Sequence, residues 1–169
     1  MSLKTIQSIF LIILLAGCSF FYRVHKDDFY NDVGTWDSAR LPLLNPYYLI
    51  YIDKEYGWQM PIKGNFPPDY YYYNGGDLLD IRKVAVEDNI VMVYTPRDRN
   101  VDDSLGQKVL HWFVMIPDKG NSEIGFDSET AFLNYIQTLG IRDVIWVEPD
   151  VAYKQFDKTG CFDWIPDCE

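Results

Sequence analysis

Residues 81–95 decide the fold and read IRKVAVEDNIVMVYT. The stretch holds two runs rich in β-branched side chains, 81–86 and 90–95, separated by the polar residues 87–89. Side chains of this kind favour strands, and so short a polar connection is typical of a β-hairpin. Because strands joined by short connections run antiparallel, the sequence predicts an antiparallel sheet built around this hairpin.

Further strands are predicted on both sides of the hairpin. Residues 47–52 form a dense β-favouring run, and apolar side chains alternate from Tyr56 to Ile62, the period of a half-buried strand. Residues 109–116 and 144–147 complete the set. From Pro149 onward the chain is expected to be irregular, apart from an extended piece at 151–156.

One amphipathic helix is predicted after the last long strand. Asp127 or Ser128 can cap its N-terminus, and Gly140 supplies the left-handed residue that commonly follows a helix. Four apolar residues between these ends share one face: Phe132, Tyr135, Ile136 and Leu139. The predicted fold class is α+β, an antiparallel β-meander with one packed amphipathic helix.

The N-terminal residues have the three parts of a secretory signal. Lys4 supplies a positive charge, residues 9–15 are an apolar run, and the small residues Ala16 and Gly17 follow. The apolar run is too short to span a bilayer, which takes about 20 residues. Residues 1–17 are therefore predicted to be a signal peptide, with a transmembrane anchor as the weaker alternative.

The sequence Leu15-Ala16-Gly17-Cys18 resembles the lipobox of bacterial lipoproteins. The resemblance implies that the Cys18 thiol takes up a diacylglycerol and becomes the first residue of the mature protein. Acyl chains would then anchor the protein to a membrane without a spanning segment. Ser19 resembles the pattern of enterobacterial lipoproteins sent on to the outer membrane, so the cell membrane or the outer membrane is expected. An ordinary secretory signal with a chance cysteine is the alternative.

The mature chain is predicted to have two parts. Residues 18–45 are assigned to the lipidated N-terminus and a tether, and residues 46–169 to a single α+β domain, long enough for a hydrophobic core. The tether segment is rich in aromatic residues, unlike a Gly/Ser linker, so part of it is expected to dock on the domain.

The chain is acidic, with 25 Asp and Glu against 15 Lys and Arg and a formal net charge of −10. This balance argues against nucleic acid as a partner, because binding to nucleic acid relies on neutralising phosphates. It is compatible with a basic protein partner or a cation. Solubility alone also explains an acidic surface.

Cys161 and Cys168 are the cysteines left once Cys18 carries lipid. Outside the cytosol such a pair usually forms a disulfide, and Pro166 favours the turn that closes the ring. A metal site of both cysteines with Asp163 and Asp167 is the competing interpretation. Its spacing matches no familiar zinc pattern, and no histidine lies near in the sequence. A disulfide is therefore predicted, with no metal and no cofactor.

The chain contains no familiar catalytic motif, so no catalytic residue is predicted. His25 lies in the tether segment, and His111 lies within a predicted strand. A packed or half-exposed strand histidine is favoured there over a catalytic base. The acidic residues Glu123, Asp127 and Glu129 are attributed to the start of the helix, where capping explains them.

Asp98, Asn100 and Asp102 copy the start of an EF-hand calcium loop. The match then fails, because Asp103 stands where the sharp turn needs Gly and Val109 stands where a bidentate Glu belongs. A solvated acidic loop is favoured over a weak calcium site.

The candidate binding segment is the run Tyr70-Tyr71-Tyr72-Tyr73. Tyrosine offers a large contact area at low entropic cost and is enriched in recognition surfaces. Ordinary strand alternation, with two rings in the core and two on the surface, is the competing interpretation.

Part of the chain is similar to small bacterial lipoproteins classed only as domains of unknown function. The similarity is carried by the stretch from Trp112 to Lys119, then Gly125 to Glu129, and then Phe132, Tyr135 and Leu139 to Ile141. It implies a strand, a turn and a short helix with an acidic cap. It implies no activity and no catalytic residue.

The leading functional expectation is a non-enzymatic, membrane-tethered binding domain of the cell envelope. Its expected partner is an envelope protein, for example a toxin or hydrolase that it neutralises. An envelope protein that binds or hydrolyses glycans is the second expectation, and a structural envelope component is the third.

Overall fold

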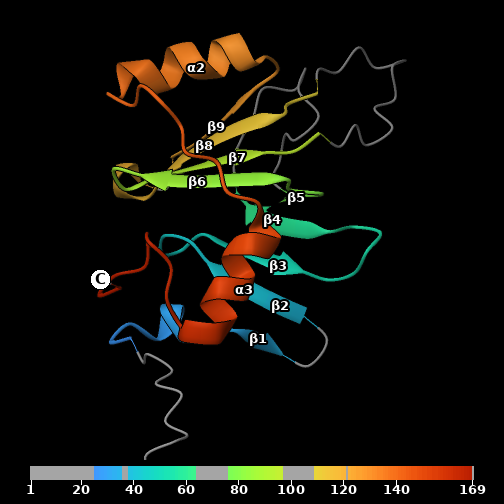
Figure 1. The fold of residues 1–169 in the computed structure, drawn as a ribbon. Helices are drawn as coiled ribbons and strands as arrows, with labels where there is room; N and C mark the ends of the chain where they lie inside the picture. Colours follow the sequence, from blue (N-terminus) through green and yellow to red (C-terminus); the bar gives the residue numbers. More distant parts are fainter. Residues whose placement is uncertain (1–24, 36–37, 64–75, 97–108, 121, 169) are drawn as a thin grey trace, which may run out of the picture.

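The computed structural model describes residues 25–35, 38–63, 76–96, 109–120 and 122–168. Within these residues the strands form two antiparallel sheets, and two α-helices pack against them (Figure 1). The predicted α+β class with an antiparallel β-meander is confirmed. No helix in these ranges is long and apolar enough to cross a membrane.

The first sheet follows a short 3-10 helix, η1 (Asp28–Tyr30), and contains five strands in chain order. Each strand pairs antiparallel with the next. The strands are β1 (Gly34–Thr35), β2 (Ser38–Pro42), β3 (Tyr48–Tyr51), β4 (Trp58–Ile62) and β5 (Gly76–Leu78).

The second sheet contains the hairpin predicted at residues 81–95. Its strands are β6 (Lys83–Glu87), β7 (Ile90–Tyr94), β8 (Trp112–Ile116) and β9 (Ser122–Phe126), with the 3-10 helix η3 (Pro117–Lys119) before β9. Glu87 pairs with Ile90, so the turn consists of Asp88 and Asn89, whose φ angles are +48° and +62°. Two positive φ angles give the turn the twist that matches its strands, and Asp and Asn tolerate them best after glycine.

The second sheet is buried on both faces. In β7, Val91 and Val93 belong to the core shared with the first sheet, whereas Ile90 and Met92 belong to a second cluster that includes residues of α2. The side chains of β8 divide in the same way. Burial of both faces explains why these strands are almost continuously hydrophobic rather than alternating.

The predicted helix is α2 (Glu129–Thr138), which covers the outer face of the second sheet (Figure 1). The Ser128 hydroxyl caps it by accepting a hydrogen bond of 3.4 Å from the amide of Ala131. Phe132 and Ile136 are buried against the sheet, and Gly140 follows with a φ of +95°. Cap, apolar face and stop signal all lie where the sequence placed them.

A second helix, α3 (Pro149–Thr159), occupies the segment expected to be irregular with an extended piece at 151–156. That expectation was wrong. Pro149 stands in the first turn and Gly160 ends the helix with a φ of +69°, while Ala152 and Phe156, four residues apart, are fully buried. Burial of this face in the shared core outweighs the strand preference of the intervening residues.

Two smaller differences concern strands. β9 was not predicted, because its residues are half-buried throughout and show no alternation. The strand predicted at 144–147 is reduced to an isolated bridge between Val84 and Val147. Each segment buries too little on one face to leave a periodic signal in the sequence.

Residues 25–35 and 38–45 are part of the fold, although the sequence placed the start of the domain near residue 46. They supply η1, β1 and β2, and so exceed the partial docking that was expected. Arg40 holds this segment in place, with its guanidinium 4.6 Å from the ring centroid of Phe29 and 4.3 Å from that of Tyr48. Its Nη1 donates to the carbonyl oxygens of Phe29 and Asp32 at 2.8 and 2.9 Å.

Candidate functional site

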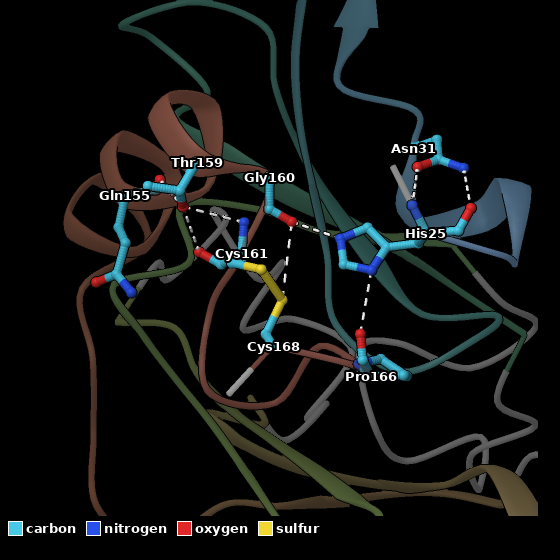
Figure 2. The surroundings of a disulfide bond; sticks show 8 residues. All are labelled: His25, Asn31, Gln155, Thr159, Gly160, Cys161, Pro166 and Cys168. Carbon is cyan, nitrogen blue, oxygen red and sulfur yellow. Dashed lines mark hydrogen bonds between the residues drawn. A yellow bond between two sulfur atoms is a disulfide. The ribbon is translucent and has the colours of Figure 1, made fainter. Parts of the chain in front are cut away.

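The predicted disulfide between Cys161 and Cys168 is present, with a Cα–Cα distance of 5.5 Å (Figure 2). The ring it closes lies directly after α3. Between the cysteines, Phe162 and Ile165 point into the shared core, and the amide of Ile165 donates to the carbonyl oxygen of Phe162 at 2.8 Å. The bond therefore fastens the C-terminal segment onto the core.

His25 lies beside this ring, although more than 130 residues separate it from the cysteines in sequence (Figure 2). Its Nε2 is 2.5 Å from the carbonyl oxygen of Gly160, and its Nδ1 is 3.1 Å from that of Pro166. Carbonyl oxygens only accept hydrogen bonds, and a neutral imidazole has a single N–H. The imidazole lies between these two carbonyl oxygens, so the ring acts as a clasp between the N-terminal segment and the C-terminal ring.

The same neighbourhood bears on the metal interpretation. One potential ligand atom each from His25, Cys161 and Cys168 lie within 4.8 Å of one another. No histidine lies near the two cysteines in the sequence, which counted against a metal site. The fold, however, places His25 beside them. In the disulfide form, however, the sulfurs are not thiolates, which is the form of cysteine that binds metals. The arrangement therefore serves cross-linking in this state.

A cleft of about 370 Å³ opens at the N-terminal end of α3. Three segments line it: the β3–β4 turn, residues 80–83 before and within β6, and residues 148–150 at the start of α3. Its size is at the lower end of the range for small-molecule sites. These segments are distant in sequence, and the contact between the two sheets and α3 brings them together.

The cleft carries charges of both signs. Its basic residues are Lys54, Arg82 and Lys83, and its acidic residues are Asp80, Glu148 and Asp150. Arg82 pairs with Asp80 at 2.9 Å, and the Trp58 indole donates to Asp150 at 2.9 Å. Glu148 is the N-cap residue of α3 and makes no side-chain capping bond.

Aromatic rings support the wall of the cleft. Trp58 is packed between Tyr51 and Tyr153, with ring centroids 5.5 and 5.4 Å away. Trp58 itself is buried, whereas Tyr51 is half-buried and lines the cleft. Exposed apolar side chains follow the lining residues along the chain, among them Ile52 and Val151, which is 54% exposed.

The structure leaves several predicted residues aside. Cys18, the tyrosine run 70–73 and the calcium-loop-like residues 98–103 lie outside the described residues. His111 is half-buried with its Nδ1 3.0 Å from the carbonyl oxygen of Thr95, as expected of a packed histidine beside a strand.

Glu123 was attributed to the start of the helix, and this was wrong. It lies on β9, and its Oε2 accepts a hydrogen bond of 2.7 Å from the backbone amide of Lys63, which follows β4. The carboxylate thus links the two sheets. Glu129 does lie in the first turn of α2, as expected.

The sequence offered no signal for the cleft. Tyr51, Arg82 and Glu148 belong to separate segments, none of which carries a motif, and only the folded chain brings them together. The same holds for the His25 clasp, whose partners lie more than 130 residues away in the sequence.

Comparison of the chain with protein-family models, with curated proteins and with solved structures finds no match.

Proposed function

We propose that the protein is an exported lipoprotein of the cell envelope whose domain acts by binding a partner rather than by catalysis. The disulfide between Cys161 and Cys168 is the observation that carries this proposal. Disulfides of this kind form and persist outside the cytosol, which agrees with a signal peptide at 1–17 and acyl chains on Cys18. An acidic surface and a short tether fit a domain displayed near a membrane.

The start of the fold restricts how such a domain would be held. The described chain begins at His25, and a fully extended segment from Cys18 to His25 reaches about 25 Å. His25 contacts Gly160 at the C-terminal end of α3, whereas the cleft lies at the N-terminal end of that helix, about 16 Å away. The tether would therefore join the domain at its disulfide end, and the cleft would lie at the other end of α3.

The cleft has features of a recognition surface. It combines three basic and three acidic residues with the half-buried ring of Tyr51, and exposed Ile52 and Val151 flank it. Interfaces commonly place aromatic and apolar anchors within a charged rim. A folded envelope protein with complementary charges is the partner that this arrangement favours.

Anchoring is tested with the full chain expressed in a Gram-negative host. Mass spectrometry of the native product should find an acylated N-terminal Cys18, and Cys18→Ser should move the protein from the membrane fraction to the soluble fraction. Cys168→Ser is the matched control and should remain membrane-bound. An unacylated protein that retains Met1 would refute the anchor.

Binding is tested by a photo-crosslinking residue placed at Val151 and, as a control on another surface, at Lys119. The expected result is one envelope protein crosslinked from position 151 and not from 119. Arg82→Glu should abolish that product, and alanine at Tyr70–Tyr73 tests whether the tyrosine run contributes. Equal products from both positions would contradict a specific partner at the cleft.

Glycan binding is the second candidate, because three carboxylates accompany Tyr51 in one cleft of small-molecule size. Carboxylates accept hydrogen bonds from sugar hydroxyls, and aromatic rings stack on sugar faces. Calorimetric titration with soluble peptidoglycan fragments would show binding that Tyr51→Ala removes. If binding is unchanged in that variant, the cleft is not the glycan site.

A further inference from the structure

A second hollow lies against the second sheet at the start of α2. Its volume is about 160 Å³, and its lining consists of Lys83, Tyr94, Trp112, Glu129 and Trp146. It shares only Lys83 with the cleft described above. Three of its five lining residues are aromatic, which sets it apart from an ordinary charged surface.

Strand register builds the floor of this hollow. Lys83 stands opposite Tyr94 in the β6–β7 pair, and Tyr94 stands opposite Trp112 in the β7–β8 pair. Directly opposed residues point to the same face, so the three side chains form one row across the sheet. The rings of Tyr94 and Trp112 are 5.3 Å apart between centroids.

The remaining two lining residues come from outside the sheet. Trp146 lies in the segment between α2 and α3, where it packs on Phe132 at 5.8 Å between ring centroids. Glu129 lies in the first turn of α2 and is exposed. Tyr94, Trp112 and Trp146 are all half-buried, so the core fixes their positions while part of each side chain stays accessible.

The chemistry of this lining favours a cation. Aromatic rings carry negative charge on their faces and attract ammonium groups within about 6 Å, and cages of such rings are a known mode of recognising alkylated ammonium. Lys83 illustrates the attraction, since its Nζ lies 5.6 Å from the ring centroid of Tyr94. The Glu129 carboxylate adds a negative charge on the same hollow.

Lys83 also limits which cation fits. A simple cation entering the hollow would be repelled by the Lys83 ammonium, whereas a ligand that also carries an acid group would be attracted to it. We propose that the hollow binds a small zwitterion, its alkylated ammonium enclosed by Tyr94, Trp112 and Trp146 beside Glu129, and its acid group paired with Lys83. The hollow has the volume of about five water molecules, room for a trimethylammonium group and a short acidic arm.

This inference does not depend on the lipid anchor or on the cleft. The ligand would enter a different hollow, and the purified protein binds it with or without a membrane. Failure of one proposal therefore leaves the other standing.

In the test, the purified protein is titrated with phosphocholine and with glycine betaine. Binding is measured by tryptophan fluorescence and by calorimetry. The matched control is 3,3-dimethylbutyl phosphate, in which carbon replaces the nitrogen and the positive charge is lost. Phosphocholine should bind about tenfold more tightly than this carbon analogue, which keeps the phosphate but lacks the ammonium, if the rings recognise the ammonium. Equal affinity would overturn the proposal.

Variants separate the roles of the lining residues. Trp112→Leu should abolish phosphocholine binding, and the exposed Glu129→Gln should weaken it several-fold even if Trp112→Leu does not fold. Lys83→Met should weaken phosphocholine binding yet strengthen binding of tetramethylammonium, which has no acid group. Lys54→Met, in the other cleft, is the control and should change neither affinity. Unchanged binding in Glu129→Gln and Lys83→Met would overturn the assignment.

A last experiment distinguishes a soluble zwitterion from a lipid headgroup. Binding of free phosphocholine or glycine betaine supports a soluble ligand. Binding to phosphatidylcholine vesicles without binding of either free compound supports a lipid headgroup. Binding of none of these probes overturns the proposal.

Discussion

Two nitrogen-containing side chains, His25 and Arg40, are buried by the fold and lie within hydrogen-bond distance of backbone carbonyl oxygens. His25 is 5% exposed and Arg40 is 9% exposed. Burial lowers the pKa of Arg40, and the nearby charge of Asp32 acts in the opposite direction. Buried polar groups are costly when unpaired, so each of these contacts ties a specific segment to the core.

The His25 clasp predicts a measurable loss of stability. In His25→Ala the carbonyl oxygens of Gly160 and Pro166 lose the imidazole that lies between them, and the free energy of unfolding should fall by about 1–3 kcal/mol. Urea denaturation followed by circular dichroism measures the change. The exposed neighbour Lys26→Ala should stay within about 0.5 kcal/mol of the wild type. Similar values for both variants would mean that the clasp contributes nothing.

Tyr47 predicts a dependence of stability on high pH. Burial raises the pKa of its hydroxyl, and the nearby negative charge of Glu123 raises it further. The folded chain thus holds this proton more tightly than the unfolded chain, whose tyrosines titrate near about pH 10. The stabilising contribution is present below that pH and is lost as the pH rises above it.

The measurement compares urea midpoints at neutral and at alkaline pH. Tyr47→Phe has no proton to lose and should lose less stability on alkalinisation than the wild type. The exposed Tyr56→Phe should behave as the wild type does. Identical alkaline losses in all three proteins would show that Tyr47 does not titrate abnormally.

At the scale of elements, α3 connects the sites described above. Its N-terminal end forms one wall of the cleft, and its C-terminal end meets the disulfide ring and His25. Ala152 and Phe156 bury its inner face in the core shared by both sheets. A change in this face should therefore affect the fold before it affects either site alone.

Phe156→Ala should cost about 3–5 kcal/mol in the free energy of unfolding, because it leaves a cavity at a fully buried position. Val151→Ala, on the exposed face of the same helix, serves as control and should have little effect. Thermal and urea unfolding both report the difference. A loss below about 1 kcal/mol at Phe156 would indicate that α3 packs only loosely.

At the scale of the whole molecule, the two ends of the described chain meet. The segment beginning at His25 lies against the ring that Cys161 and Cys168 close, so one end of the molecule joins the N-terminal segment to the C-terminal one (Figures 1 and 2). The second sheet, which consists of β6 to β9 and carries α2 on its outer face, lies on the far side of the shared core. A load on an N-terminal tether would act first on this cross-linked end.

Removal of the disulfide should lower the stability of the whole fold. The disulfide lowers the conformational entropy of the unfolded chain. In the double variant Cys161→Ser/Cys168→Ser the free energy of unfolding should therefore fall by about 2–4 kcal/mol. A reducing agent should lower the free energy of unfolding of the wild type by a similar amount and leave that of the double variant unchanged. Reduction without any effect on the wild type would show that the bond is dispensable for folding.

Local sequence determined much of the fold. The hairpin at 81–95, the capped helix at 129–138 and the pairing of the cysteines all follow from signals within a few residues: β-branched runs, a Ser cap with a Gly stop, and two cysteines seven positions apart. Such signals act through backbone geometry and neighbouring side chains, and distant contacts reinforce them. The signal peptide and the lipobox expected at residues 1–18 are local patterns as well, and they stay predictions.

Tertiary structure alone decided the rest. α3 forms because Ala152 and Phe156 find a core made by strands from both sheets, and β9 forms because β8 offers it a partner. The cleft, the aromatic hollow and the His25 clasp each join segments that lie tens of residues apart. No local pattern encodes such contacts, because their free energy exists only once the intervening chain has packed and closed the distance.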